Sequence, residues 1–331
     1  MLRTAGWVLV CAAALAALGC SGLKLQLHNA SVQKPSNVAL YFAVETRDGK
    51  PVPGMTAEMF RIYEDDQLIS PYESKQTILN PEVAVVHFTV LLLDLSGSIT
   101  ESGSMPALID AASAFADRVT RSHHMAVFGF DGSADLVPLT GFSTRSAKIK
   151  AGLRRLKHHR VRDPSTNLNG AVVAAVDVLE KRMGRAEQPL RFGTLVVFTD
   201  GTDRAHRVRE AAMYARLDQA DINVFAIGLG GEIAVDQLQQ LGASGFVKAT
   251  ELAQIGTAFD RVAALIEAAA RKFYLLSYCS PSRAGSHQLR VEAIHGEQAG
   301  SLSHTFDATG FGPGCDPARK PDFEVDRIRL R

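Results

Sequence analysis

The sequence predicts an α/β fold: an open, mostly parallel sheet with helices on both faces, together with a small accessory β module. Over residues 83–272, apolar and β-branched runs alternate with segments of helical periodicity. These runs show little polar alternation, which is typical of parallel strands buried on both faces. Outside that range, shorter strands are bounded by turn residues. We therefore predict a Rossmann-like central domain with accessory strands before and after it.

The overall composition is that of a globular protein with one large domain and a smaller one. The chain has 331 residues, of which 46% are hydrophobic and 21% are charged, and its formal net charge is +1. Domains usually contain about 100–200 residues. The near-neutral charge gives no reason to expect nucleic acid as a partner. A basic stretch at 154–162 is interpreted as a solvated helix end and loop, with a contact for an acidic partner as the alternative.

Residues 1–19 have the pattern of a secretory signal. A positive charge at Arg3 precedes an apolar run at 5–18, which is short for a bilayer of about 30 Å. The run ends in Ala17-Leu18-Gly19-Cys20, which resembles the lipobox of bacterial lipoproteins, although that family usually has leucine at the position of Ala17. The resemblance implies lipidation of Cys20 and an anchor in the bacterial cell envelope, at the outer membrane or the periplasmic face. Export without a lipid is the alternative.

Cysteine usage also favours export. Cys11 and Cys20 belong to the predicted signal and its end, which leaves Cys279 and Cys315 as an even pair. We predict that these two cysteines form a disulfide, because the exported compartment permits one. Closing a loop of this length stabilises the folded state by about 3–4 kcal/mol in the chain-entropy treatment. Two unrelated thiols are the alternative.

The accessory module is predicted in two parts that flank the central domain. Residues 20–36 are polar and are interpreted as a linker that lifts the folded part off the membrane. Residues 37–82 form an N-terminal β module with strands at 38–44 and 60–64. Residues 273–310 are predicted to join it with strands at 273–278, 287–293 and 302–306. The tail, 311–331, is rich in glycine, proline and charge and is expected to be poorly ordered apart from Cys315.

The central domain, 83–272, contains four apolar strand runs and six helical segments. The strands are predicted at 85–93, 125–130, 194–198 and 222–227. The helices are predicted at 105–121, 144–156, 167–183, 205–219, 235–241 and 251–272. Ala112, Phe115 and Val119 recur at helical spacing, and we interpret such stripes as core.

Acidic and hydroxyl residues follow two of these strands. Asp94, Ser96 and Ser98 come directly after the first apolar run, and Asp200 follows the third. Because parallel strands end at the same edge of a sheet, both aspartates are expected there, where open α/β folds bind ligands. Thr166 lies in a loop just before a predicted helix and is the third element of this group.

Two carboxylates and three hydroxyls that converge on one point suit a hard divalent cation. Mg²⁺ takes six oxygens at about 2.0–2.1 Å and keeps several waters. No cysteine or clustered histidine lies at these strand ends, which disfavours zinc or copper. The histidine pairs His123-His124 and His158-His159 are interpreted as solvated surface. The expected cofactor is therefore Mg²⁺, with Mn²⁺ or Ca²⁺ as alternatives.

The order Asp94-x-Ser96-x-Ser98, Thr166 and Asp200-Gly201 resembles the metal-ion-dependent adhesion site of von Willebrand factor type A domains. The resemblance covers about residues 83–272, and the departure is Ser165, where the family usually has glycine. It implies that the two serines bind the metal directly, that the threonine binds directly or through water, and that the aspartates act largely through water. It further implies a protein partner that presents an acidic residue to the metal, and no enzymatic activity.

The same residues allow three other interpretations. Asp, Ser and Thr are good helix caps, so capping alone is one alternative. A structural envelope protein with a metal-free site is a second alternative. A Mg²⁺-dependent hydrolase is the third, although phosphatases of the haloacid dehalogenase type need a second aspartate where Ser96 stands. The chain also lacks a G-x-S-x-G nucleophile elbow.

Overall fold

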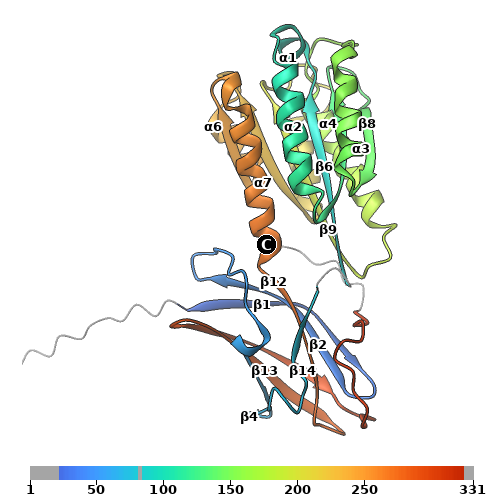
Figure 1. Ribbon diagram of the computed structural model, residues 1–331. Coiled ribbons are helices and arrows are strands. Elements are labelled where there is room, and N and C mark those ends of the chain that lie inside the picture. Colours follow the sequence, from blue (N-terminus) through green and yellow to red (C-terminus); the bar gives the residue numbers. More distant parts are fainter. Residues whose placement is uncertain (1–21, 81–83, 324–331) are drawn as a thin grey trace, which may run out of the picture.

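The computed structural model describes residues 22–80 and 84–323, which form an α/β domain and a β sandwich (Figure 1). The predicted signal, 1–19, and the predicted lipidation site, Cys20, lie outside the described residues. Within the described part of the chain, no helix combines the length and the apolarity needed to cross a membrane.

The α/β domain is built on a six-stranded sheet in the order β11-β10-β9-β6-β7-β8. Neighbouring strands are parallel except for the edge strand β8, which runs antiparallel to β7. The mostly parallel sheet predicted from the sequence is therefore confirmed. The strands are β6 (Val85–Asp94), β7 (His123–Phe130), β8 (Val137–Ser143), β9 (Leu190–Thr199), β10 (Ile222–Leu229) and β11 (Gly245–Ala249).

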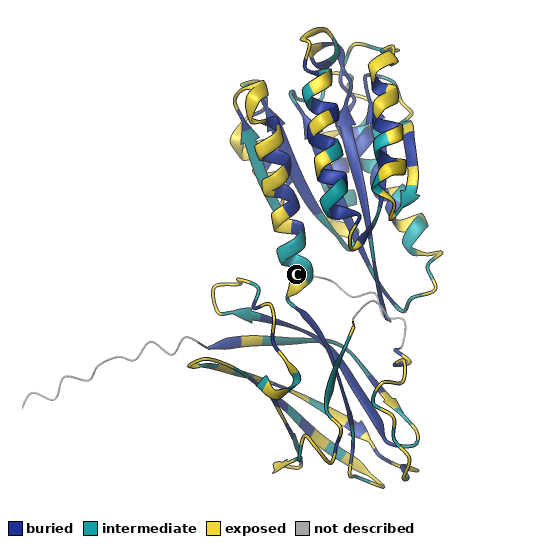
Figure 2. Cartoon of the chain, in the orientation of Figure 1, coloured by how far each residue is buried: buried dark blue, intermediate teal, exposed yellow. Residues whose placement is uncertain are grey.

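Helices cover both faces of this sheet, as predicted. Leu91 and Leu93 of β6 pack into a core with α2, α3 and α7, whereas Val90 and Leu92 pack into a second core with α4, α5 and α6. Figure 2 shows the helices buried toward the sheet and exposed on their outer sides. The helices are α1 (Gly97–Glu101), α2 (Met105–Val119), α3 (Ser146–Arg154), α4 (Leu168–Met183), α5 (Glu210–Gln219), α6 (Val235–Leu241) and α7 (Ile255–Arg271).

The accessory module is a sandwich of two four-stranded sheets, β1-β2-β12-β5 and β14-β13-β3-β4. Each sheet combines strands that precede and strands that follow the α/β domain, as the sequence predicts. Their facing sides enclose one apolar core. The strands are β1 (Leu23–Gln33), β2 (Asn37–Thr46), β3 (Phe60–Glu64), β4 (Gln67–Leu68), β5 (Thr77–Leu79), β12 (Phe273–Cys279), β13 (Ser286–His295) and β14 (Gln298–Asp307).

The C-terminal segment is fastened to this sandwich. A disulfide joins Cys279 at the end of β12 to Cys315, which confirms the predicted pair. Phe311 and Phe323 are both buried, so the described part of the tail is packed against the protein rather than poorly ordered. Their apolar side chains supply the reason, because burying an aromatic ring favours one fixed position of the chain.

The predicted linker, 20–36, is also different in the structure. Its described part forms β1, which pairs antiparallel with β2 from Leu23 opposite Thr46 to Gln33 opposite Asn37. Leu25 and Leu27 pack against the sandwich core. Alternate apolar residues give this segment one face to bury, which a flexible linker would leave in water. The prediction of a linker over these residues is therefore wrong.

An apolar cluster joins the two domains. It brings Tyr41 of β2 and Phe273 of β12 together with Phe192 of β9. The Phe273 and Phe192 ring centroids are 5.4 Å apart, and those of Phe273 and Tyr41 are 5.4 Å apart. Aromatic pairs at such distances add to the stabilisation from burial alone.

The row of rings continues into the α/β domain through two histidines. The His87 centroid lies 5.1 Å from that of Phe192 and 4.6 Å from that of His123. His123 is buried, and its Nδ1 lies 2.8 Å from the Thr89 hydroxyl. The prediction that His123 is solvated is wrong, because its side chain projects into the domain junction rather than into water.

Candidate metal-binding site

The first part of the candidate site is the turn that follows β6. Asp94 ends the strand and is fully buried. Its carboxylate accepts a hydrogen bond from the Ser96 amide at 2.9 Å and another from the Thr199 hydroxyl at 2.7 Å. Because Thr199 ends the neighbouring strand β9, Asp94 links the carboxyl ends of two central strands. These ends form the edge at which ligands of open α/β sheets bind.

The hydroxyls of the two serines in this turn lie close to each other, with Ser96 Oγ and Ser98 Oγ 3.2 Å apart. Ser96 is buried and Ser98 is exposed, so the pair leads from the interior to the surface. Ser96 immediately precedes α1, yet its side chain makes no capping hydrogen bond. Helix capping therefore does not explain the serine at this position.

The loop that carries Thr166 is hydrogen-bonded to the loop after β6 and to the loop after β9. The Gly97 amide donates to the Pro164 carbonyl at 3.0 Å, and the Thr166 carbonyl accepts from the Arg204 amide at 2.8 Å. A Cβ atom at Gly97 would lie 3.2 Å from the Pro164 Cβ, so glycine allows this close approach. Thr166 itself is buried. The backbone thus holds the three predicted loops at one end of the sheet.

Asp200 follows β9 and faces the serines. Burial raises the pKa of its carboxyl group, and a hydrogen bond with the Ser98 side chain acts in the opposite direction. Its Oδ1 is buried and has no hydrogen-bond partner within residues 22–80 and 84–323. A buried carboxylate oxygen without a partner is costly and calls for a donor or a cation.

The charge at this edge also fits a cation. Burial is the main cause that raises the pKa of Asp94 to about 6, and the nearby charge of Asp200 adds to the rise. A cation close to these groups would favour their ionised forms. Among the described residues, no group of three or more His, Cys, Asp or Glu side chains forms a ligand cluster. The predicted set has two such residues, and its other members are hydroxyls, which suit a hard cation.

Two residues that support the site were not predicted from the sequence. The Thr199 hydroxyl donates a hydrogen bond to the Asp94 carboxylate. In the sequence, only its position directly before Asp200 marks this threonine. Asp131 directly follows β7 at the same edge and is fully buried. Its carboxylate accepts from the Arg162 amide at 3.0 Å, and its carbonyl accepts from the Asn167 amide at 3.0 Å. Asp131 therefore shapes the loop that carries Thr166, and its position at a strand end was the available signal.

The fold and this edge define an α/β domain with an oxygen-rich set of side chains above its parallel strands. The sequence profile of the von Willebrand factor type A domain matches residues 89–261, more than half of the chain. The chain belongs to this family. No curated protein matches it over its sequence.

Several solved structures resemble the chain at low sequence identity. The von Willebrand factor type A protein from Catenulispora acidiphila is 11% identical over 88% of this chain and 74% of its own, with a TM-score of 0.48. Manganese-loaded TRAP protein from Plasmodium vivax is 13% identical over 76% of this chain and 99% of its own, with a TM-score of 0.47. Proximal thread matrix protein 1 from the mussel byssus, with a zinc-occupied MIDAS motif, is 17% identical over 55% of this chain, with a TM-score of 0.47. The match spans about half of that mussel protein, 48%.

Proposed function

We propose that this chain is a protein-binding module that takes up a hard divalent cation, Mg²⁺ before Mn²⁺ or Ca²⁺, and binds an acidic residue of a protein partner. The residues that would hold the ion are Asp94, Ser96, Ser98, Thr166 and Asp200. The observation that carries the proposal is the buried Oδ1 of Asp200, which has no hydrogen-bond partner among the described residues. The same carboxyl group bonds the Ser98 side chain, whose hydroxyl lies 3.2 Å from that of Ser96.

The donor set explains why such a site would bind a partner. The three hydroxyls are neutral, and with the two aspartates acting through bridging waters, as the family resemblance implies, the charge of a divalent ion would be only partly compensated by direct contacts. The bound ion would thus supply a positive charge that attracts an anionic side chain of the partner. Type A domains generally serve adhesion and interaction rather than catalysis. Among the similar structures, the mussel protein has a zinc-occupied MIDAS motif and the TRAP protein is manganese-loaded.

Titration of the purified protein with Mg²⁺ and Mn²⁺ tests the proposal. We expect calorimetric uptake of one ion and a raised unfolding temperature, because a ligand that binds only the folded state stabilises it. Failure to take up either ion would contradict the proposal and favour the metal-free structural role. Turnover of a generic phosphoester would also contradict it, in favour of a hydrolase.

We further propose that Cys20 carries the lipid that anchors the protein in the bacterial envelope, at the outer membrane or the periplasmic face. The support is the order of charge, apolar run and small residue before Cys20. Stable anchoring requires more than one acyl chain, since a single chain binds membranes only marginally. Cys20→Ser is expected to move the protein from the membrane fraction to the soluble fraction. Continued membrane association of this variant would refute the lipid anchor.

A further inference from the structure

A strongly basic segment, residues 136–162, precedes the loop that carries Thr166. It contains eight lysines and arginines and no aspartate or glutamate, although the formal net charge of the whole chain is only +1. The segment forms β8, α3 and a 3-10 turn at Arg155–His158. Positive charges that the fold holds close together repel each other, so an anionic ligand bound here would offset an unfavourable interaction.

Most of these cations have no carboxylate partner within the described part of the chain. Lys150 pairs with Asp117 of α2 at 2.8 Å, and the Arg155 guanidinium donates to the Leu139 carbonyl. The other six are exposed and make no ion pair within residues 22–80 and 84–323. They are Arg145, Lys148, Arg154, Lys157, Arg160 and Arg162. Their charge is therefore available to a partner.

The same segment also contains a groove. The helix α3 lies beside β8 (Figure 1), and residues of both elements line a groove of about 550 Å³. Because β8 is the last strand of its sheet among the described residues, no further strand covers this side. Pro138 and Leu139 of β8 and Ala151 of α3 supply apolar lining, and Lys148 and Arg155 supply two cations. Such a groove suits a ligand that has both apolar and acidic side chains.

The side chains of the segment favour a protein as its partner over other anions. None of the large hydrophobic side chains that are exposed in the described chain lies within 136–162, so the segment offers nothing to insert into a membrane. Its single phenylalanine, Phe142, packs against the core, and it has no tyrosine or tryptophan on which a nucleic-acid base could stack. A phosphate polymer has no apolar groups for the groove. An acidic protein segment can supply both kinds of contact.

We infer that the groove between α3 and β8 binds an acidic, amphipathic segment of a protein, independently of the metal. Apolar side chains of that segment occupy the groove, and its carboxylates bind Lys148, Arg155 and the surrounding cations. Side chains rather than strand pairing provide the recognition, because Pro138 lacks an amide proton and the Leu139 carbonyl is already bound. The inference goes beyond the proposed function, since none of the proposed metal ligands lines the groove.

Synthetic peptides test the inference in the presence of a chelator. The probes are short glutamate-rich peptides with leucine at every second, third or fourth position, each compared with the same peptide carrying serine for leucine. At least one leucine peptide is expected to bind at least about tenfold more tightly than its serine counterpart, because the groove buries a leucine side chain. Alanine methyl labelling lets the Ala151 signal report occupancy of the groove by NMR. Inorganic polyphosphate and vesicles of phosphatidylcholine and phosphatidylglycerol represent the other anions.

Two pairs of variants locate the binding. Lys148→Glu should weaken the leucine peptide at least about fivefold, whereas Lys181→Glu, the same change at an exposed lysine of α4 on the other face of the sheet, should not. Ala151→Trp fills the groove and should abolish the preference for leucine, whereas Ala147→Trp places the same ring at an exposed position of α3 outside the lining and should preserve it.

Three results would overturn the inference. The first is an equal affinity for leucine and serine peptides. The second is equally tight binding of polyphosphate or vesicles, which would indicate a general polyanion surface. The third is a preference for leucine that Ala151→Trp leaves intact or that appears only when Mg²⁺ is present. Binding of leucine peptides that needs Mg²⁺ would support the metal site alone, and binding that persists in chelator would support the groove whatever the metal site does.

Discussion

Asp200→Ala is expected to abolish divalent-metal uptake and, with it, metal-dependent binding of a partner. At a metal concentration about a hundredfold above the dissociation constant, the wild-type protein should gain about 2.7 kcal/mol of stability, and the variant should gain none. In the absence of metal, the variant should be as stable as wild type or slightly more so. The reason is that the Asp200 Oδ1 is buried without a partner, so its removal relieves a cost. Chemical denaturation with and without Mg²⁺ measures both effects.

Two further variants make this prediction specific. Asp94→Asn removes the charge but retains an acceptor for the Ser96 amide, so uptake should fall while the fold persists. Asp135→Ala is the matched control, because Asp135 is exposed in the loop after β7 and belongs to no predicted ligand set. It should leave uptake unchanged. Metal-induced stabilisation of the wild-type size in both Asp94→Asn and Asp200→Ala would refute the ligand assignment.

The strand-end motifs were accessible from the sequence because each depends on local order. A buried run that ends in Asp94, and another that ends before Asp200, place two acids at one edge once the sheet is parallel. Asp131 has a similar signal, an aspartate directly after a strand, but the following glycine favours a simple turn. Its role depends on backbone amides of the loop before Thr166, which the sequence does not bring close to it.

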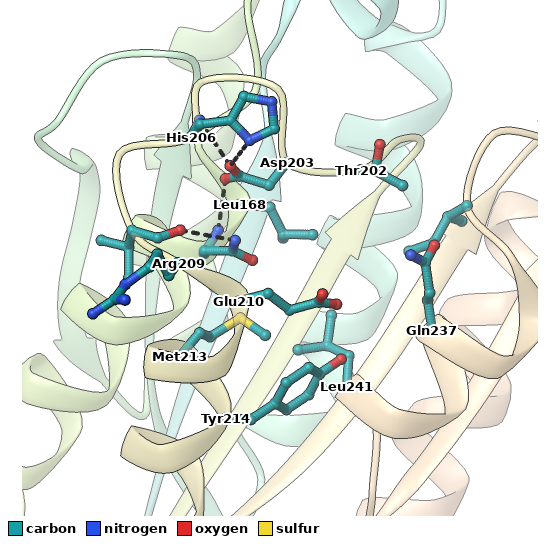
Figure 3. Close-up of a pocket in the computed structure, with 13 residues that line it drawn as sticks. Leu168, Thr202, Asp203, His206, Arg209, Glu210, Met213, Tyr214, Gln237 and Leu241 are labelled. Carbon is teal, nitrogen blue, oxygen red and sulfur yellow. Dashed lines mark hydrogen bonds and ion pairs between the residues drawn. The ribbon is translucent and has the colours of Figure 1, made fainter.

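The features that escaped prediction depend on contacts between distant segments. The alternation of Leu23, Leu25 and Leu27 is clear, but its burial depends on β2 and the sandwich core that cover it. The edge strand β8 contains Pro138 and pairs irregularly with β7, so its sequence shows no regular strand period. The cavity lined by Met213 of α5 and Leu241 of α6 (Figure 3) takes its walls from three separate stretches of chain, 168–169, 202–214 and 233–241. Neither periodicity nor motif spacing reports such a convergence.

Lowering the pH from about 6.5 to about 4 is expected to destabilise the domain junction. Burial lowers the pKa of His87 to about 4, and burial also lowers the pKa of His28 to about 4, with a contribution from the charge of Lys272. In the unfolded chain, histidine binds a proton near pH 6.5. Between these values the unfolded state binds more protons than the folded state, so the free energy of unfolding falls as the pH falls.

The variant His87→Phe separates the loss of stability that His87 causes at low pH from the loss caused by other titrating groups. A phenyl ring can stack between Phe192 and His123, as the imidazole does at 5.1 and 4.6 Å, but it cannot be protonated. The shift for His87 corresponds to at most about 3 kcal/mol, since the side chain keeps partial exposure. The free energy of unfolding, measured by denaturation at pH 7, 6, 5 and 4, should therefore depend less on pH in the variant than in the wild-type protein. Because the carboxylates titrate alike in both proteins, an identical loss of stability in the two would show that His87 does not couple the junction to pH.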